Sequence, residues 1–201
     1  MSGGLRCFVA VELPEVLREA IAAYFAAEGR RVAGVRWVSP GNLHLTLKFL
    51  GDVSEERLPA LRAAIAAAAA GGSPFTLTLR GAGVFPSPER PRVIWVGAGA
   101  GAARLSALAL SVEATVTPLG FAQEGRPFAP HLTVGRIAYR TPDREGLRRL
   151  LDSACDREWG EWVVPAVHLV RSELFPRGPI YSILQTTPLP DTLRQGSEGA
   201  R

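Results

Sequence analysis

The chain has 201 residues, of which 47% are hydrophobic, so it can bury a sizeable core and does not belong to the disordered class. Its 23 basic and 19 acidic residues give a formal net charge of +4, and a pI near 9.7 favours anionic partners such as nucleic acids or phosphate esters. Two cysteines are too few for a disulfide framework, which favours a reducing, cytoplasmic location. The apolar run 8–11 is interrupted by Glu12, so neither a signal peptide nor a membrane span is predicted.

The first half of the chain alternates between strand and helix periodicities. Pro14 and Gly29 bound the first predicted helix, and Gly71 ends the second. The predicted strands are 6–13, 35–38, 43–49 and 75–80, and the helices are 14–28 and 58–70. Residues 81–91 contain three prolines and two glycines, so they are expected to form a loop and hinge between the halves.

The second half repeats this order. The expected elements are a strand at 92–97, a helix at 102–116, a loop at 118–130, a strand at 132–137, a helix from Pro142 to Ser153, one long bent strand at 162–174 and a last strand at 180–186. Beyond Pro188 the chain is polar, and residues 189–201 are expected to be a disordered tail.

One tetrapeptide occurs in both halves. His44-Leu45-Thr46-Leu47 returns 87 residues later as His131-Leu132-Thr133-Val134, and the strand starting at Arg6 returns 86 residues later at Arg92. We therefore expect an α+β fold in a single domain, residues 1–188, with two pseudo-symmetric lobes, about 6–80 and 92–186. Each lobe should be an antiparallel sheet with helices on its outer face, and the active site should lie in a groove between them.

The repeated motif has the residue types for acid/base chemistry on a phosphate. On a strand, each histidine shares a face with the threonine two residues on, and the aliphatic residues take the other face. Two histidines can act as a general acid and a general base, and the hydroxyls of Thr46 and Thr133 can donate to phosphate oxygens. Strict alternation also places Lys48 on the first His-Thr face, but it places Arg136 opposite His131 unless Gly135 permits a bulge. Aromatic residues on strands are more often core residues than ligand contacts. The aromatic residues that could stack on a nucleobase are Phe8, Trp37, Phe49, Phe128 and Tyr181.

Other chemistries have weaker support. Neither motif carries a third metal ligand on its His-Thr face, so no metal is expected. Cys7 falls in an apolar strand, and no serine occupies a nucleophile elbow. The glycines of 97–101 fit a βα connection better than a dinucleotide-binding loop. His168 stands apart from both motifs and is interpreted as a strand histidine with a structural environment.

The paired His-x-Thr-x motifs resemble those of the 2H phosphoesterases. The wider sequence is similar to the bacterial and archaeal RNA 2',3'-cyclic phosphodiesterases, formerly described as 2'-5' RNA ligases. The similar segments are 6–14, 37–51, 83–97, 126–136 and 174–184.

This resemblance implies a bilobal enzyme that needs no metal or cofactor and hydrolyses RNA 2',3'-cyclic phosphate ends to 2'-phosphomonoesters. It implies that His44 protonates the leaving 3' oxygen, that His131 activates water, and that Thr46 and Thr133 hold the phosphate. Arg136 and Phe49 would contact the substrate, with Lys48 and Tyr181 as further candidates. The expected partners are RNA or oligonucleotide ends, with no membrane, and the expected state is a monomer. A 2'-5' RNA ligase, a 2'-5' oligonucleotide phosphodiesterase and a non-catalytic RNA-end binding module remain alternatives.

Overall fold

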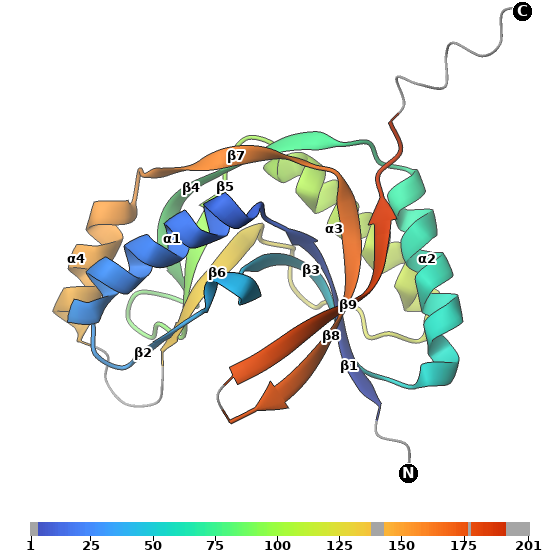
Figure 1. Cartoon of the computed structure of the whole chain (residues 1–201), viewed down its shortest axis with the longest axis horizontal. Coiled ribbons are helices and arrows are strands. Elements are labelled where there is room, and N and C mark those ends of the chain that lie inside the picture. Colours follow the sequence, from blue (N-terminus) through green and yellow to red (C-terminus); the bar gives the residue numbers. More distant parts are fainter. Residues whose placement is uncertain (1–3, 138–142, 177, 192–201) are drawn as a thin grey trace, which may run out of the picture.

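Two antiparallel sheets organise the computed structural model, which describes residues 4–137, 143–176 and 178–191 (Figure 1). The four-stranded sheet has the order β3-β1-β8-β9, from β1 (Leu5–Glu12), β3 (His44–Val53), β8 (Ala166–Phe175) and β9 (Gly178–Pro188). The five-stranded sheet has the order β2-β6-β5-β4-β7, from β2 (Val35–Trp37), β4 (Phe75–Phe85), β5 (Val93–Ala98), β6 (His131–Ile137) and β7 (Glu158–Val164). The predicted α+β class with two similar lobes is confirmed, because β3-β1-β8 and β6-β5-β4 repeat the same antiparallel pairings.

In the described part of the chain four α-helices cover the sheets: α1 (Glu15–Glu28), α2 (Leu58–Ala70), α3 (Ala102–Val116) and α4 (Arg144–Ala154). α1 and α4 lie along the five-stranded sheet, and α2 packs against α3 beside the four-stranded sheet (Figure 1). The sequence signals located these helices to within two residues, and Asp143 caps α4 by accepting from the Gly146 N–H at 3.0 Å. The predicted start of that helix, Pro142, lies outside the described residues. No described helix is long and apolar enough to cross a membrane.

Each sheet contains strands from both halves of the chain. The expected lobes, about 6–80 and 92–186, would each have had a sheet of their own. β4 belongs to the first half but lies between β5 and β7, and β8 and β9 belong to the second half but lie beside β1. The helices are exchanged as well, since α1 covers the five-stranded sheet and α3 contacts β3. Each lobe is therefore built from both halves, because strand pairing between distant segments follows tertiary packing rather than chain order.

Two predicted segments differ from the structure. The expected loop 81–91 begins only after Phe85, because Gly81 takes a positive φ of 67° at an irregularity and β4 continues through it. The expected long strand 162–174 is two strands in different sheets, divided at Pro165, which has no N–H for a sheet ladder. Leu189, the first residue of the expected tail, is buried, and its N–H donates to the Pro165 carbonyl at 2.8 Å; residues 192–201 of that tail lie outside the described residues.

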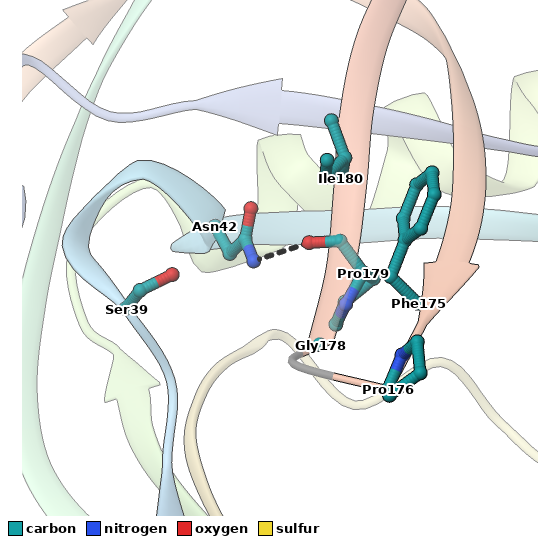
Figure 2. A pocket seen from close by; sticks show the side chains of 7 residues that line it. All are labelled: Ser39, Asn42, Phe175, Pro176, Gly178, Pro179 and Ile180. Atoms are coloured by element: carbon teal, nitrogen blue, oxygen red, sulfur yellow. Dashed lines mark hydrogen bonds between the residues drawn. The ribbon is translucent and has the colours of Figure 1, made fainter.

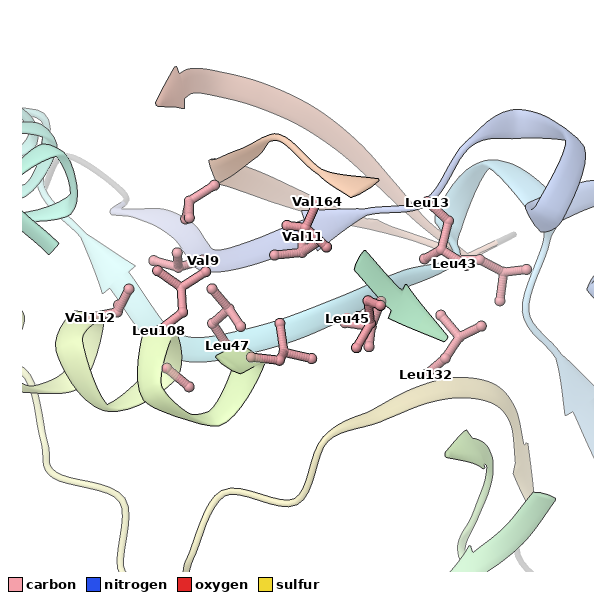
Figure 3. Packing of buried hydrophobic residues seen from close by; sticks show 14 of the residues in the cluster. Val9, Val11, Leu13, Leu43, Leu45, Leu47, Leu108, Val112, Leu132 and Val164 are labelled. Atoms are coloured by element: carbon pink, nitrogen blue, oxygen red, sulfur yellow. The ribbon is translucent and has the colours of Figure 1, made fainter. Parts of the chain in front are cut away.

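A continuous core holds the two motif strands together. Leu45 of β3 and Leu132 of β6 are fully buried in one cluster with Leu108 and Val112 of α3 (Figure 3). These aliphatic residues occupy the alternate positions of the two motifs, so the histidines and threonines are forced to the opposite face. We call this opposite face of both sheets the motif face.

Candidate active site

The two motif histidines are anchored in the same way. Nδ1 of His44 lies 2.8 Å from the Asn42 carbonyl oxygen, and Nδ1 of His131 lies 2.7 Å from the Ala129 carbonyl oxygen. A carbonyl can only accept, so Nδ1 carries the hydrogen in both rings and Nε2 is left for proton transfer. Nε2 of His44 also lies 3.0 Å from the Thr46 hydroxyl. β3 contacts β6, so the strands that carry the two motifs lie next to each other.

The two imidazoles have different surroundings. His44 stacks on Phe8 with ring centroids 4.7 Å apart and meets the edge of Tyr181 at 5.2 Å. His131 meets the edge of Phe85 at 5.0 Å. Burial, partly offset by the Asn42 carbonyl, lowers the pKa of His44 to about 4, and burial also lowers the pKa of His131. Both rings are therefore biased toward the neutral form in the free protein.

A bulge follows the first motif and reverses the expected side of Lys48. Thr46 and Lys48 are two residues apart, yet they pair with the consecutive β1 residues Ala10 and Val9. Lys48 therefore shares the core face with Val9, and Phe49 turns to the motif face. The prediction that Lys48 lies beside His44 and Thr46 is wrong, because it assumed unbroken alternation.

A matching bulge follows the second motif. It turns Arg136 to the face of His131, as the sequence predicted only for the case of a bulge at Gly135. Thr133 pairs with Trp95, and Arg136 pairs with Val93, two residues along the same strand, so both side chains point to the motif face. Gly135 fits this turn because a Cβ atom there would lie 3.0 Å from the Trp37 ring. The positive charge of Arg136 acts on both histidines and helps to lower the pKa of each. Arg136 thus belongs to the same site.

The chain matches the family model of LigT-like phosphoesterases over residues 11–95 and again over 96–181. It belongs to this family. The double match agrees with the internal repeat, since its two segments begin 85 residues apart, within two residues of the repeat length. An RNA 2',3'-cyclic phosphodiesterase of Methanothermobacter thermautotrophicus is 39% identical over 182 residues, covering 90% of this chain and 97% of the relative. A relative of the same name from Thermus thermophilus is 37% identical, covering 90% of this chain and 88% of its own.

Solved structures share the fold of this phosphoesterase. Thermus thermophilus TT0787 superposes with a TM-score of 0.77 at 35% identity, covering 93% of this chain and 99% of that one. E. coli LigT complexed with 3'-AMP superposes with a TM-score of 0.74 at 32% identity, covering 92% and 98%. These similarities extend over both lobes.

The Lys48 side chain is buried in a structural ion pair and does not point into the site. Its side chain is 1% exposed, and Nζ lies 2.8 Å from Glu113 Oε2 on α3. Nζ also donates to the Ala122 carbonyl, and Glu113 Oε1 accepts from the Glu124 N–H at 2.9 Å. Lys48 therefore ties β3 to α3 and to the segment that leads toward His131.

Aromatic side chains line the phosphoesterase site on the β3 side. Phe8, Phe49 and Tyr181 form one group, with ring centroids 6.4 Å apart for Phe8 and Phe49 and 5.1 Å apart for Phe8 and Tyr181. Phe49 is 60% exposed, so its ring is accessible to a ligand. Trp37 instead stacks on Phe25 of α1 at 5.6 Å, and Phe128 packs against the core. The structure thus separates the aromatic candidates into site and core residues.

Asn42 is a site residue that sequence reasoning missed. Its carbonyl accepts from His44, and its Nδ2 donates to the Pro179 carbonyl at 2.9 Å, so it links the β8–β9 hairpin to the start of the motif strand (Figure 2). Between this turn and the hairpin lies an open cavity of about 460 Å³, lined by Ser39, Asn42, Phe175, Pro176, Gly178, Pro179 and Ile180. No local sequence signal pairs residue 42 with residue 179, because the contact joins segments 137 residues apart.

The remaining candidates have structural environments. His168 is buried on β8, and its Nδ1 lies 3.2 Å from the Thr186 hydroxyl, as expected for a strand histidine with a hydrogen-bond partner. Cys7 is buried, and burial raises the pKa of its thiol, which disfavours the nucleophilic thiolate. In the described part of the chain, no three histidine, cysteine, aspartate or glutamate residues are grouped to hold a metal ion.

Proposed function

We propose that this chain is an RNA 2',3'-cyclic phosphodiesterase that hydrolyses the cyclic end to a 2'-phosphomonoester by acid/base catalysis with two histidines. The observation that carries the proposal is the matched pair of imidazoles, each with Nδ1 held by a backbone carbonyl so that Nε2 is the nitrogen that can transfer a proton. The names of the relatives support the substrate class. Because one histidine comes from each half, residues 5–189 would act as one functional unit.

In the proposed reaction, a water oxygen attacks phosphorus while Nε2 of His131 takes the proton of that water. The bond from phosphorus to the 3' oxygen breaks, and Nε2 of His44 gives its proton to that oxygen, leaving the phosphate on the 2' oxygen. Burial keeps both rings biased toward neutrality in the free protein. The negative charge of a bound phosphate raises the pKa of an adjacent imidazole, so substrate binding favours the protonated acid. Exchange with solvent then restores both rings. This assignment of roles follows the family resemblance.

Three further groups would hold the substrate. The hydroxyls of Thr46 and Thr133 lie two residues after the histidines on the motif face and would donate to the non-bridging phosphate oxygens. Arg136 would add a charge-assisted contact. Phe49, which is exposed and lies beside Phe8 and Tyr181, would stack on the terminal nucleoside.

Product analysis tests the proposal directly. EDTA-treated protein should convert a nucleoside 2',3'-cyclic phosphate to the 2'-phosphate, identified by chromatography against both isomers. Absence of turnover, or a 3'-phosphate product, would contradict it. Loss of turnover on EDTA treatment, restored by a metal ion, would contradict the metal-independent mechanism. Size-exclusion chromatography checks the monomeric state, which stays a prediction, as does a cytoplasmic location.

The acid and base roles can be separated with a leaving group that needs little protonation. In a substrate with sulfur at the bridging 3' position, the thiolate leaves more readily than an alkoxide because its conjugate acid is stronger. His44→Ala should regain activity on this substrate relative to the oxygen substrate, and His131→Ala should not. The reverse pattern would exchange the two roles.

A further inference from the structure

Two arginines stand directly opposite each other at the edge of the five-stranded sheet. Arg36 of the edge strand β2 pairs with Arg136 of β6 in the antiparallel register. Their strand neighbours Trp37 and Gly135 also pair and face the core side, where Trp37 stacks on Phe25 of α1. Arg36 and Arg136 therefore both point to the motif face, and both are exposed.

This arrangement is unfavourable without an anion. Residues directly opposite in an antiparallel pair have Cβ atoms roughly 4.5–5.5 Å apart, and like charges at that position repel. Within residues 4–137, 143–176 and 178–191, neither guanidinium has a carboxylate partner within 4.0 Å. A bound phosphate would relieve the repulsion, because two guanidinium groups can share its oxygens through charge-assisted hydrogen bonds.

The position of the pair relative to the histidines indicates which phosphate it would hold. Arg136 acts electrostatically on His44, His131 and Tyr181, so it lies beside the site of the reacting phosphate. Arg36 lies one strand farther out, at the rim of the sheet. An anion between the two would therefore be next to the reacting phosphate along the substrate, not the reacting phosphate itself.

The other motif strand offers no such pair. β3 is itself the edge of the four-stranded sheet, and the residue that corresponds to Arg136 there is Phe49. Aromatic rings lie beside both histidines, with Phe85 next to His131, but at the position after the bulge β3 carries the exposed Phe49 and β6 carries Arg136. This difference gives the substrate a direction, with the terminal nucleoside toward Phe49 and the rest of the strand leaving past β6 and β2.

We propose that Arg36 and Arg136 form a second anion subsite for the phosphodiester that joins the terminal nucleotide to the preceding one. This inference rests on the proposed function and specifies its substrate class as oligonucleotide ends rather than mononucleotides. Arg136 contributes to both phosphates, and Arg36 serves the internucleotide phosphate alone.

The experiment varies the charge of that linkage. The kcat/KM is measured for a nucleoside 2',3'-cyclic phosphate, for a dinucleotide with the same cyclic end, and for this dinucleotide with an uncharged methylphosphonate linkage. We expect the native protein to prefer the charged over the uncharged dinucleotide about tenfold, as for loss of one charge-assisted contact. Arg36→Gln should weaken this preference several-fold, because only Arg136 then remains at the linkage, and it should leave the mononucleotide rate unchanged. Higher salt should weaken the preference, because the pair is exposed.

A control and two contradicting outcomes complete the design. Arg148→Gln removes the same charge from the exposed side of α4, where it pairs with Asp152 on the helix surface, and should keep the native preference. Equal rates on the charged and uncharged dinucleotides in the native protein would overturn the subsite. So would an Arg36→Gln loss that is equal on mononucleotide and dinucleotide. Failure of the native protein to hydrolyse the cyclic end of the mononucleotide and of both dinucleotides would instead refute the proposed function.

Discussion

The two motif strands show how a repeat can make a site that is symmetric in one respect and directional in another. β3 and β6 share a histidine anchored to the carbonyl two residues earlier, a threonine two residues later and a bulge after the motif. They differ at the two positions that follow the bulge, which are Lys48 and Phe49 on β3 and Gly135 and Arg136 on β6. The shared features concern protons and phosphate, which are common to both sides of a phosphoryl transfer. The differing features concern the rest of the substrate, whose two ends are unlike.

Removing either histidine should have the largest effect. We expect His44→Ala and His131→Ala each to lower kcat on a nucleoside 2',3'-cyclic phosphate by about 10²-fold or more, since each removes one general acid or base. The double variant should be little worse than the singles, because both groups act in one step. His168→Gln is the matched control, a buried histidine on β8 that should keep its activity. A near-native rate in either motif variant would mean that the two copies do not share a site.

Replacing Lys48 tests whether this residue, which follows the bulge on β3, stabilises the fold and does not bind the substrate. Lys48→Met leaves the partly buried Glu113 without this cation, and breaking such a pair costs up to about 3 kcal/mol. Urea denaturation should show this loss, while KM at a temperature well below unfolding should stay near native. The double variant Lys48→Met, Glu113→Leu should recover stability. A raised KM with unchanged stability would instead indicate that Lys48 contacts the substrate.

The threonines should be less sensitive than the histidines. Thr133→Val removes one hydroxyl donor to a charged phosphate, which should lower kcat/KM about 10-fold or somewhat more. Thr46→Val should lose at least as much, because its hydroxyl also lies 3.0 Å from Nε2 of His44. Initial-rate kinetics on a cyclic mononucleotide check both variants, and valine keeps the shape of the side chain. A native rate for either variant would remove that threonine from the phosphate site.

The smallest expected effect is a shift of the pH profile. We expect kcat/KM to be bell-shaped, with its two limbs set by the pKa values of the two histidines in the free protein. The charge of Arg136 lowers the pKa of both His44 and His131, so Arg136→Gln should move both limbs to higher pH, by less than about one unit. Arg36→Gln is the matched control and should leave both limbs in place. A limb that does not move would not belong to either histidine.

Local signals in the sequence were enough to locate most elements and the motif pair. Pro14 and Gly29 enclose α1, and the aliphatic positions of both motifs face the core as predicted. Helix ends and strand faces depend mainly on residues that are close together in the sequence. The residue types of the candidate site can therefore be predicted from the sequence, and their catalytic roles stay a prediction.

The features that were missed depend on contacts between distant segments. The bulge after Thr46 has no glycine to signal it, so Lys48 was placed on the wrong face, whereas Gly135 gave a warning for Arg136. The Asn42 contact with Pro179 and the division of the long strand at Pro165 depend on which sheet each segment joins. Pairing of that kind follows the packing of the whole core and cannot be determined from periodicity along one segment.

The exchange of β4 and β8 between the lobes has a consequence for the integrity of the molecule. Neither half of the chain contains the strands of one complete sheet, so a protein cut between β4 and β5 would have no lobe able to fold alone. Two copies of a half-length ancestor would satisfy the same pairings only by swapping strands in a two-fold homodimer. Joining such copies end to end makes the association intramolecular and independent of concentration. It also frees the two copies to diverge, as Phe49 and Arg136 have.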